Sequence, residues 1–221
     1  MERNVVEVKS KRRYDSSRRR AQAATTQDRV LDVARRQFLR DGYAATTVAG
    51  IADEAGTSVE TVYKAFGGKS ALVRELWLRG LGGRGPVPAP ERSDVLSATE
   101  PDPVRVLHGW GAFTTEVAPQ LAPILMLVRG AAAADPDMAE LLADAEAQHR
   151  ERMRHNARRL QRRGWLRPGV GLRQATDILW VYSSTELYDL LVLKSGWPLE
   201  RYGEFIGDAL VAALLPRPPG A

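Results

Sequence analysis

The spacing of the apolar residues is the feature that most limits how this chain of 221 residues can fold. Apolar side chains recur at intervals of three and four residues along most of the sequence, which is the period of an α-helix buried on one face. We find no stretch of strand length in which apolar and polar residues alternate between hairpin turns, and no repeat of fixed period. The sequence therefore predicts an all-α protein.

Glycine and proline divide the chain into four parts. Residues 1–25 hold eight Lys and Arg against three acidic residues, with little apolar surface, so we expect a disordered basic arm. Residues 26–81 show the pattern of four short helices separated by glycines. Residues 82–103 contain five of the 13 prolines and three glycines, which predicts a linker or a surface loop. Residues 104–221 are again helical in pattern and hold the larger share of apolar residues, so they predict a second helical domain. The helices expected in that domain span 104–117, 121–134, 137–163, 172–194 and 199–215.

The first helical domain contains a helix-turn-helix pattern. Gly56 ends a short helix that Thr46 or Thr47 can cap, and Ser58 caps the next helix after a turn of three or four residues. In that second helix two apolar residues four positions apart face a small core, so the other side chains point largely outward. A short second helix with a polar outer face, in a basic part of the chain, is typical of a unit that places this helix in a DNA major groove.

A series of residues at fixed spacing runs through this domain without a gap. Its members are Phe38, Gly42-Tyr43, Thr47-Val48, Ile51-Ala52, Ala55-Gly56, Ser58, Val62-Tyr63, Phe66, Lys69 and Leu72. Over about fifty residues this series resembles the N-terminal DNA-binding domain of TetR/AcrR-type transcriptional regulators. The resemblance implies an N-terminal three-helix helix-turn-helix domain followed by a C-terminal helical domain for ligand binding and dimerisation.

The resemblance also implies which residues meet DNA. Residues expected to contact phosphates are Thr47, Tyr63, Lys64 and Lys69. The expected base-reading residues are Thr57, Val59, Glu60 and Thr61, with Ser58 at the start of the same helix. A valine or threonine methyl group can contact a thymine methyl group, and a glutamate can accept a hydrogen bond from cytosine N4. Thr57 and Glu60 depart from the residues usual in the family, so base preference is expected to differ from that of relatives at those two positions.

The positive charge lies in the same third of the chain. The net charge is +5, and residues 1–80 hold 16 Lys and Arg against 10 Asp and Glu, while residues 81–221 hold 16 against 17. An anionic partner is therefore expected to meet the first third.

Several of these residues have an alternative role. Tyr63 either contacts phosphate or covers the helix core, and Lys64 and Lys69 either contact phosphate or are only solvated. The arm arginines either enter a minor groove or form a solvated tail; they are Arg12, Arg13, Arg18, Arg19 and Arg20.

The second domain is expected to pair with another copy of the chain. Between residues 172 and 194 apolar side chains fall on more than one helix face, which is more than a single core contact requires. The last helix adds Phe205, Ile206, Leu210 and Leu214. These residues predict a homodimer through helices 172–194 and 199–215.

A small-molecule effector of unknown identity is expected in the second domain. Its candidate wall combines aromatic and hydroxyl side chains, a composition shared by small-molecule pockets and by ordinary cores. The wall consists of Trp110, Phe113, Thr114, Met126, Trp180, Ser183, Ser184 and Tyr188. The lack of a charge cluster favours an uncharged, apolar ligand.

We expect no enzyme, no metal site and no cofactor. A single E-x-x-H motif, from Glu146 to His149, has the spacing used by di-iron carboxylate bundles, but those bundles need a second such motif. The segment from Ala143 to Arg163 is charged on all sides, so its histidines are expected on a solvated face. No serine lies in a nucleophile-elbow or triad pattern.

Composition sets the compartment and the class of protein. The absence of cysteine excludes a disulfide framework and thiol catalysis. The most apolar stretch, Leu121 to Ala134, is short and carries Arg129, and the N-terminus lacks the apolar region of a secretory signal. We therefore expect no membrane span and a cytoplasmic location.

Together these features predict a homodimeric, ligand-responsive transcriptional regulator, more often a repressor in the resembled family. It would bind a pseudo-palindromic double-stranded DNA operator. Two other classes remain open at this point: an architectural DNA-binding protein that needs no ligand, and a helical-cavity enzyme or scavenger.

Overall fold

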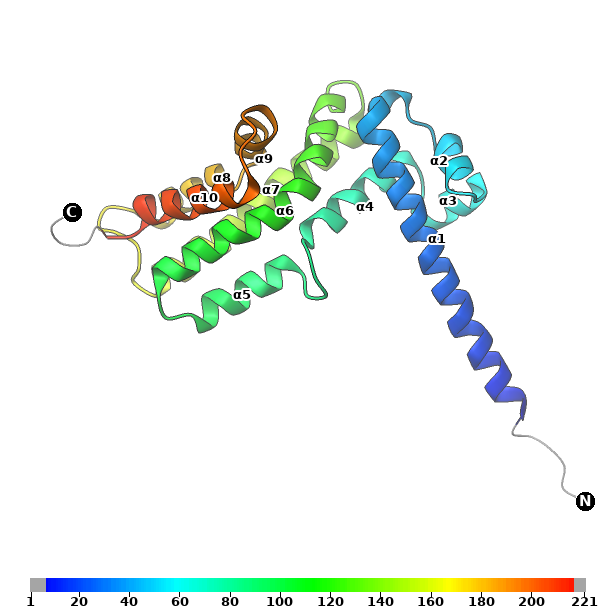
Figure 1. Cartoon of the computed structure of the whole chain (residues 1–221), viewed down its shortest axis with the longest axis horizontal. Helices are drawn as coiled ribbons and strands as arrows, with labels where there is room; N and C mark the ends of the chain where they lie inside the picture. The colour runs from blue at the N-terminus through cyan, green and yellow to red at the C-terminus, as the bar shows by residue number, and fades with distance from the viewer. Residues whose placement is uncertain (1–6, 217–221) are drawn as a thin grey trace, which may run out of the picture. The chain divides into compact units, whose positions relative to one another are not determined.

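Every regular element in the part of the chain that the structure describes is a helix (Figure 1). The computed structural model describes the backbone of residues 7–216 and the side chains of residues 17–216. The chain divides into two compact units, Met1–Glu75 and Leu76–Ala221. The all-α fold class predicted from the sequence is thereby confirmed.

The first unit is built on four helices around a small core. It contains α1 (Glu7–Ala45), α2 (Val48–Glu54), α3 (Val59–Phe66) and the first half of α4 (Lys69–Leu81). Each helix buries apolar residues at helical spacing: α1 buries Val30, Ala34 and Phe38, α2 buries Ile51, α3 buries Val62, and α4 buries Leu72 and Val73. Since a helix of eight residues is unstable alone, α3 depends on this packing for its structure.

Side-chain caps and two glycines set the ends of α2 and α3. Thr47 Oγ1 accepts a hydrogen bond from the Gly50 amide at 3.0 Å, and Ser58 Oγ accepts one from the Thr61 amide at 3.1 Å. Gly56 has a φ of 62° in the turn between the helices, and Gly67 ends α3 at a φ of 92°. A residue with a β-carbon would be strained by about 1–2 kcal/mol in this left-handed region.

The basic arm is helical where the structure describes it, which corrects the expectation of disorder. Helix α1 begins at Glu7, so residues 7–25 continue the helix that packs in the core from Val30 onward. Arg, Ala and Gln have favourable helix propensity, and extending a helix that packing has already formed adds no nucleation cost. The arm's first six residues lie outside the described part of the chain.

The second unit is a bundle around one long helix. Its elements are the rest of α4, α5 (Ala89–Thr99), α6 (Pro103–Ala131), α7 (Pro136–Arg162), α8 (Leu172–Tyr182), α9 (Thr185–Tyr188), the π-helix η1 (Asp189–Lys194) and α10 (Leu199–Leu214). Helix α6 packs against α5, α7, α9 and α10, and α7 also packs against α8 (Figure 1). The shared core therefore lies around α6.

Part of the expected linker is a helix. Within residues 82–103 the structure forms α5, whose Ala89, Ser93 and Ser97 are buried. Proline is tolerated in the first turn of a helix, where the missing amide has no intrahelical partner. The prolines therefore begin α5 instead of preventing it.

Two of the expected helix boundaries are also wrong. Helix α6 runs without interruption through Pro119 and Pro123, where a break was expected, because buried residues on both sides fix its path. The expected helix 172–194 is instead divided into α8, α9 and η1. At the first division Ser183 Oγ donates to the Leu179 carbonyl at 2.7 Å, the kind of local bond that competes with the helix.

Helix α6 is long and apolar enough, by length and composition, to cross a membrane, which differs from the expectation from sequence. The core helix of a soluble protein passes the same test. Here the apolar side chains of α6 pack against neighbouring helices or line the cavity described below. These contacts account for the apolar composition of α6 within the protein itself.

Helices α6 and α10 approach each other at glycines. A β-carbon on Gly111 would overlap the carbonyl oxygen of Gly203 and would lie 2.8 Å from the Gly207 nitrogen. A β-carbon on Gly207 would lie 3.1 Å from His108 Cα. The two backbones are therefore too close for any larger residue at the crossing.

Candidate functional site

Helix α3 presents most of the predicted DNA-binding residues to solvent. Within α3 only Val62 is buried, while Tyr63 is 52% exposed and Val59 is 40% exposed. Glu60, Thr61 and Lys64 are also exposed. Tyr63 therefore does not cover the core, and α3 offers an aromatic, an acidic and a basic side chain on its outer surface.

The residues at the start of α3 are held by the cap. Ser58 Oγ and Thr61 Oγ1 lie 2.8 Å apart, and the Thr57 amide donates to the Ala52 carbonyl at 2.9 Å. Thr57 is half-buried, unlike its neighbours on α3. These bonds fix the first turn of α3 relative to α2 and so fix which side chains the helix presents.

Thr47 and Lys69 lie at the ends of neighbouring helices and have partners inside the first unit. Thr47 is exposed and caps α2. Lys69 Nζ lies 4.2 Å from the centroid of the Tyr43 ring and donates to the Ala44 carbonyl at 3.3 Å. Tyr43 in turn stacks on Phe38 with ring centroids 6.0 Å apart. Lys69 thus joins the start of α4 to the end of α1, a contact that sequence reasoning did not predict.

Glu54 holds α2 against α1 through residues that sequence reasoning missed. Gln37 Nε2 donates to Glu54 Oε2 at 2.7 Å and to the Gly50 carbonyl at 3.2 Å, and Arg36 pairs with Glu54 at 2.8 Å. The hydrogen bonds from Gln37 and Arg36 keep the pKa of Glu54 below its ordinary value. The signal in the sequence is that buried Gln37 follows Val30 by seven residues on the apolar stripe of α1.

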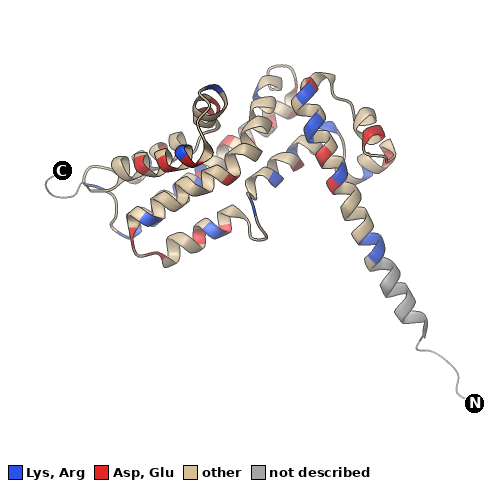
Figure 2. Cartoon of the chain, in the orientation of Figure 1, with Lys and Arg blue, Asp and Glu red and all other residues tan. Residues whose placement is uncertain are grey.

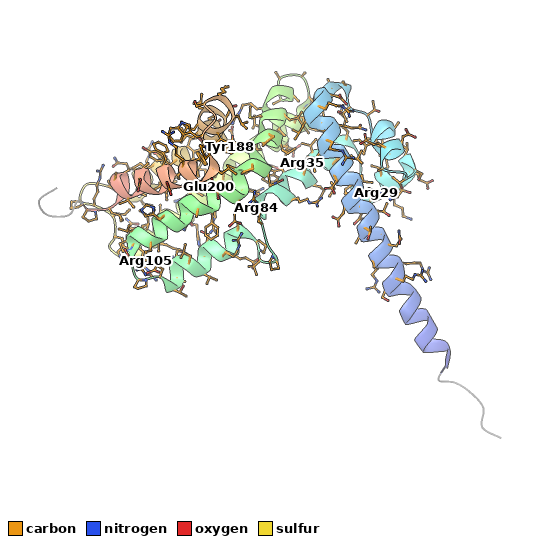
Figure 3. The ribbon with its side chains drawn as sticks, viewed as in Figure 1. Arg29, Arg35, Arg84, Arg105, Tyr188 and Glu200 are labelled. Atoms are coloured by element: carbon orange, nitrogen blue, oxygen red, sulfur yellow. The ribbon has the colours of Figure 1, made fainter. Side chains whose placement is uncertain are left out.

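Basic side chains follow much of α1 in the described part of the chain (Figure 2). Arg29 and Arg35 extend from it in Figure 3. Arg18, Arg19 and Arg20 are exposed, whereas the side chains of Arg12 and Arg13 lie outside the described residues.

The second unit contains a cavity of about 440 Å³ lined by α4, α5, α6, α7, α8, α9 and α10. Six of the eight predicted ligand-binding residues line this cavity: Trp110, Phe113, Thr114, Trp180, Ser183 and Ser184. The other two do not. Met126 is 38% exposed, and Tyr188, labelled in Figure 3, packs edge-on against Tyr202 with centroids 5.8 Å apart.

The charged side chains that line the cavity are paired with one another or with nearby residues. Arg129 pairs with Glu186 and, at 3.3 Å, with Glu146, while Arg152 pairs with Asp94 at 3.0 Å. Burial acts to raise the pKa of Glu186, but a backbone hydrogen bond and Arg129 outweigh it and lower the pKa. The wall therefore presents no net charge to a ligand.

His149 lines this cavity, which corrects the expectation that it lies on a solvated face. Its Nε2 is 2.8 Å from Ser183 Oγ. Because the Ser183 hydroxyl donates to the Leu179 carbonyl, we assign His149 Nε2 as the donor to Ser183. Burial lowers the pKa of His149, partly opposed by Glu186, so the ring is neutral at pH 7. Among the described residues no three His, Asp or Glu side chains are grouped so that they could hold a metal ion.

Other cavity residues on α7 were missed as well. They follow one face at helical spacing: Leu142, Ala145, His149, Met153 and Asn156. That stripe was visible in the sequence, but the dense charges on the other faces of α7 concealed it. Asn156 is 5% exposed, and its Oδ1 has no hydrogen-bond partner within the protein.

Helix α5 closes one side of the cavity with Ala89, Pro90 and Ser93. Asp94, on the same helix, is 3.2 Å from His155 Nε2 and pairs with Arg152 and Arg159 of α7. Burial acts to raise the pKa of Asp94, but Arg152, Arg159 and His155 outweigh it and lower the pKa. Ion pairs thus hold α5 to α7.

The apolar residues predicted for dimerisation fall into two groups. Ile206, Leu210 and Leu214 are buried in the core of the second unit, so they are not available to a partner, which corrects the prediction. A second group remains on the surface: Val181, Leu190, Leu193 and Phe205 are between 37% and 53% exposed. Phe205 packs edge-on against Trp197, with ring centroids 5.5 Å apart.

Comparison with known proteins agrees with this arrangement. The family model described as "Bacterial regulatory proteins, tetR family" matches residues 30–76. No curated protein matches the sequence.

Three solved structures share the fold over most of their own length. The SmeT–triclosan complex is 22% identical at a TM-score of 0.68, with 89% of this chain and 96% of SmeT covered. NalD, the secondary repressor of the MexAB-OprM multidrug efflux pump in Pseudomonas aeruginosa, is 20% identical at 0.66, with 88% and 98% covered. The fatty acid degradation regulator FadR from Bacillus halodurans is 16% identical at 0.69, with 84% and 94% covered. This chain is therefore a TetR-family protein by its helix-turn-helix domain, and it has the fold of TetR-family regulators.

Proposed function

We propose that this protein is a ligand-responsive transcriptional regulator, acting as a repressor, that binds a pseudo-palindromic DNA operator as a homodimer. The observation that carries the proposal is the exposed outer surface of α3, within a helix-turn-helix that matches the TetR family model. A helix of this kind enters the major groove, where each base pair presents a distinct pattern of donors and acceptors.

The exposed residues of α3 divide by the chemistry that they offer. Glu60 can accept from cytosine N4, and Val59 and Thr61 can meet a thymine methyl group, so these side chains read bases together with Thr57. Tyr63, Lys64, Thr47 and Lys69 contact phosphates, which position the protein but carry little sequence information. Ser58 holds the first turn of α3 in place for both tasks.

The effector site in this proposal is the cavity of the second unit. Trp77 and Leu81 of α4 line the cavity, while Leu72 and Val73 of the same helix lie in the core of the first unit. A ligand in the cavity therefore contacts a helix that also belongs to the DNA-binding unit. SmeT, which shares the fold, is known in complex with triclosan, which supports a small-molecule effector here.

The dimer in this proposal forms through the exposed apolar residues of α8, η1 and α10. Val181, Leu190, Leu193 and Phe205 offer an apolar surface that the second unit does not cover. A two-fold arrangement would pair this surface with itself. Two copies of α3 would then meet two operator half-sites.

Selection of random DNA duplexes by the intact protein tests this proposal. We expect enrichment of an inverted repeat whose half-sites are separated by one helical turn or a multiple of it, about 10 base pairs. Binding without enrichment, with a steep dependence on salt, would support an architectural DNA-binding protein instead. No binding at low salt would exclude both DNA-binding functions and favour the enzyme or scavenger.

A further inference from the structure

Two buried polar atoms in the wall of the cavity have no hydrogen-bond partner within the protein. They are Nε1 of Trp110 on α6 and Oδ1 of Asn156 on α7. Trp110 is 6% exposed and Asn156 is 5% exposed, and both residues line the cavity. Leaving a buried donor or acceptor unpaired is unfavourable, so such atoms point to a partner that enters the cavity.

The other polar groups of the wall with identified bonds are already engaged. The Thr114 hydroxyl donates to the Gly111 carbonyl at 2.6 Å, and the Ser183 hydroxyl donates to the Leu179 carbonyl. Arg129 and Arg152 are paired with carboxylates. Trp110 and Asn156 are therefore the groups of the wall best placed to select a ligand by hydrogen bonding.

The chemistry of the two atoms defines the ligand. An indole N–H is only a donor and requires an acceptor, whereas an amide oxygen requires a donor. We infer, on the basis of the proposed function, that the effector is an uncharged, mainly apolar molecule whose polar group is a hydroxyl or a similar donor–acceptor pair, bound by Trp110 and Asn156. The apolar remainder of the ligand packs against side chains such as Phe113 and Leu125, which line the same cavity. A charged ligand is disfavoured because the wall has no unpaired charge to compensate its desolvation.

Equilibrium dialysis of the intact protein with three matched probes tests this inference. The probes are 2-naphthol, naphthalene and 2-naphthoate, which share one ring system and carry a hydroxyl, no polar group and a charge. We expect 2-naphthol to bind about tenfold more tightly than naphthalene, because only 2-naphthol satisfies the buried atoms. We expect 2-naphthoate to bind most weakly.

Three variants locate the preference. Asn156→Leu and Trp110→Phe remove one unpaired atom each and keep an apolar side chain, so each should reduce the preference for 2-naphthol over naphthalene. Thr114→Val is the matched control, because it removes a cavity hydroxyl that is already bonded to α6. It should keep the preference. Circular dichroism confirms that each variant is folded, and the comparison of probes on the unsubstituted protein needs no variant.

Several results would overturn the inference. They are equal affinity for 2-naphthol and naphthalene, tightest binding of 2-naphthoate, no binding of any probe, or a preference that survives both Asn156→Leu and Trp110→Phe. The dialysis contains no DNA, so its outcome is separate from the proposed function. If 2-naphthol binds with the expected preference but leaves operator affinity unchanged, the ligand class stands and the proposed regulation fails.

Discussion

At the scale of single residues, the outer surface of α3 separates contacts that position the protein from contacts that read sequence. Tyr63 and Glu60 are both exposed on this short helix, three residues apart, and differ in what they can recognise. A phosphate contact is the same for every sequence, whereas a base contact is not. The two residues therefore give opposite expectations for the same measurement.

We predict that Tyr63→Ala weakens binding to all DNA sequences by a similar factor, about tenfold. Glu60→Ala should instead change which base pair is preferred at one position of each half-site, and Thr57→Ala should do so at a neighbouring position. Fluorescence anisotropy on the selected operator and on single-base variants of it measures both effects. A change of preference in Tyr63→Ala, with uniform weakening in Glu60→Ala, would reverse the assigned roles.

His149 gives a prediction about stability and pH. Burial lowers its pKa in the folded state, so as pH falls through about 6.5 the unfolded state takes up a proton before the folded state does. The free energy of unfolding should therefore decrease as pH falls below about 6.5 and down to the lower pKa of the folded state. Urea unfolding between pH 5 and 8 tests this, with His149→Gln expected to show a smaller decrease. The same slope in both proteins would contradict the buried, neutral state of His149.

At the scale of helices, the sequence predicted where burial follows a simple period and failed where local and tertiary effects compete. Val30, Ala34 and Phe38 recur on one face, and Gly56 and Ser58 mark the turn, so the helix-turn-helix was predictable. Helix α5 was missed because its prolines resemble those of a loop, although they lie in the first turn. The continuity of α6 through its prolines depends on packing against other helices, which no local pattern records.

The crossing of α6 and α10 gives a prediction about stability. Gly111→Ala places a β-carbon on the backbone of α10, which must move away, so we expect a loss of about 1–3 kcal/mol in the free energy of unfolding. Gly130→Ala is the matched control, because Gly130 lies in the same helix with nothing within 4 Å of its β-carbon position. It should stabilise the protein by about 0.4–1 kcal/mol. Thermal unfolding measures both, and equal effects would show that the crossing is not as close as described.

The candidate site was partly predictable for the same reasons. Six of the predicted cavity residues share the wall because aromatic and hydroxyl side chains recur at helical spacing on α6 and α8. His149 and Asn156 were missed because their identity as cavity residues depends on which face of the highly charged α7 turns inward. Met126 was included because its local pattern resembles that of a buried residue, but it lies at the surface.

At the scale of the whole molecule, the proposal requires two copies of the chain. We predict that Val181→Glu converts a dimer into a monomer, because a charge would be buried in the apolar interface without a partner. Val95→Glu is the control, since Val95 is 61% exposed on α5, outside the proposed interface, and should leave the dimer intact. Sedimentation velocity at micromolar concentration distinguishes the two states. A monomeric unsubstituted protein, or a dimer that survives Val181→Glu, would contradict this interface.

The central claim is that this chain reads a specific DNA sequence through α3. The most direct measurement is DNase I footprinting by the intact protein on a long fragment that carries the selected operator, at about 0.15 M salt. The account predicts one discrete protected segment with two symmetric halves, weakened by Tyr63→Ala. Protection spread along the whole fragment, or no protection even at low salt, would contradict it.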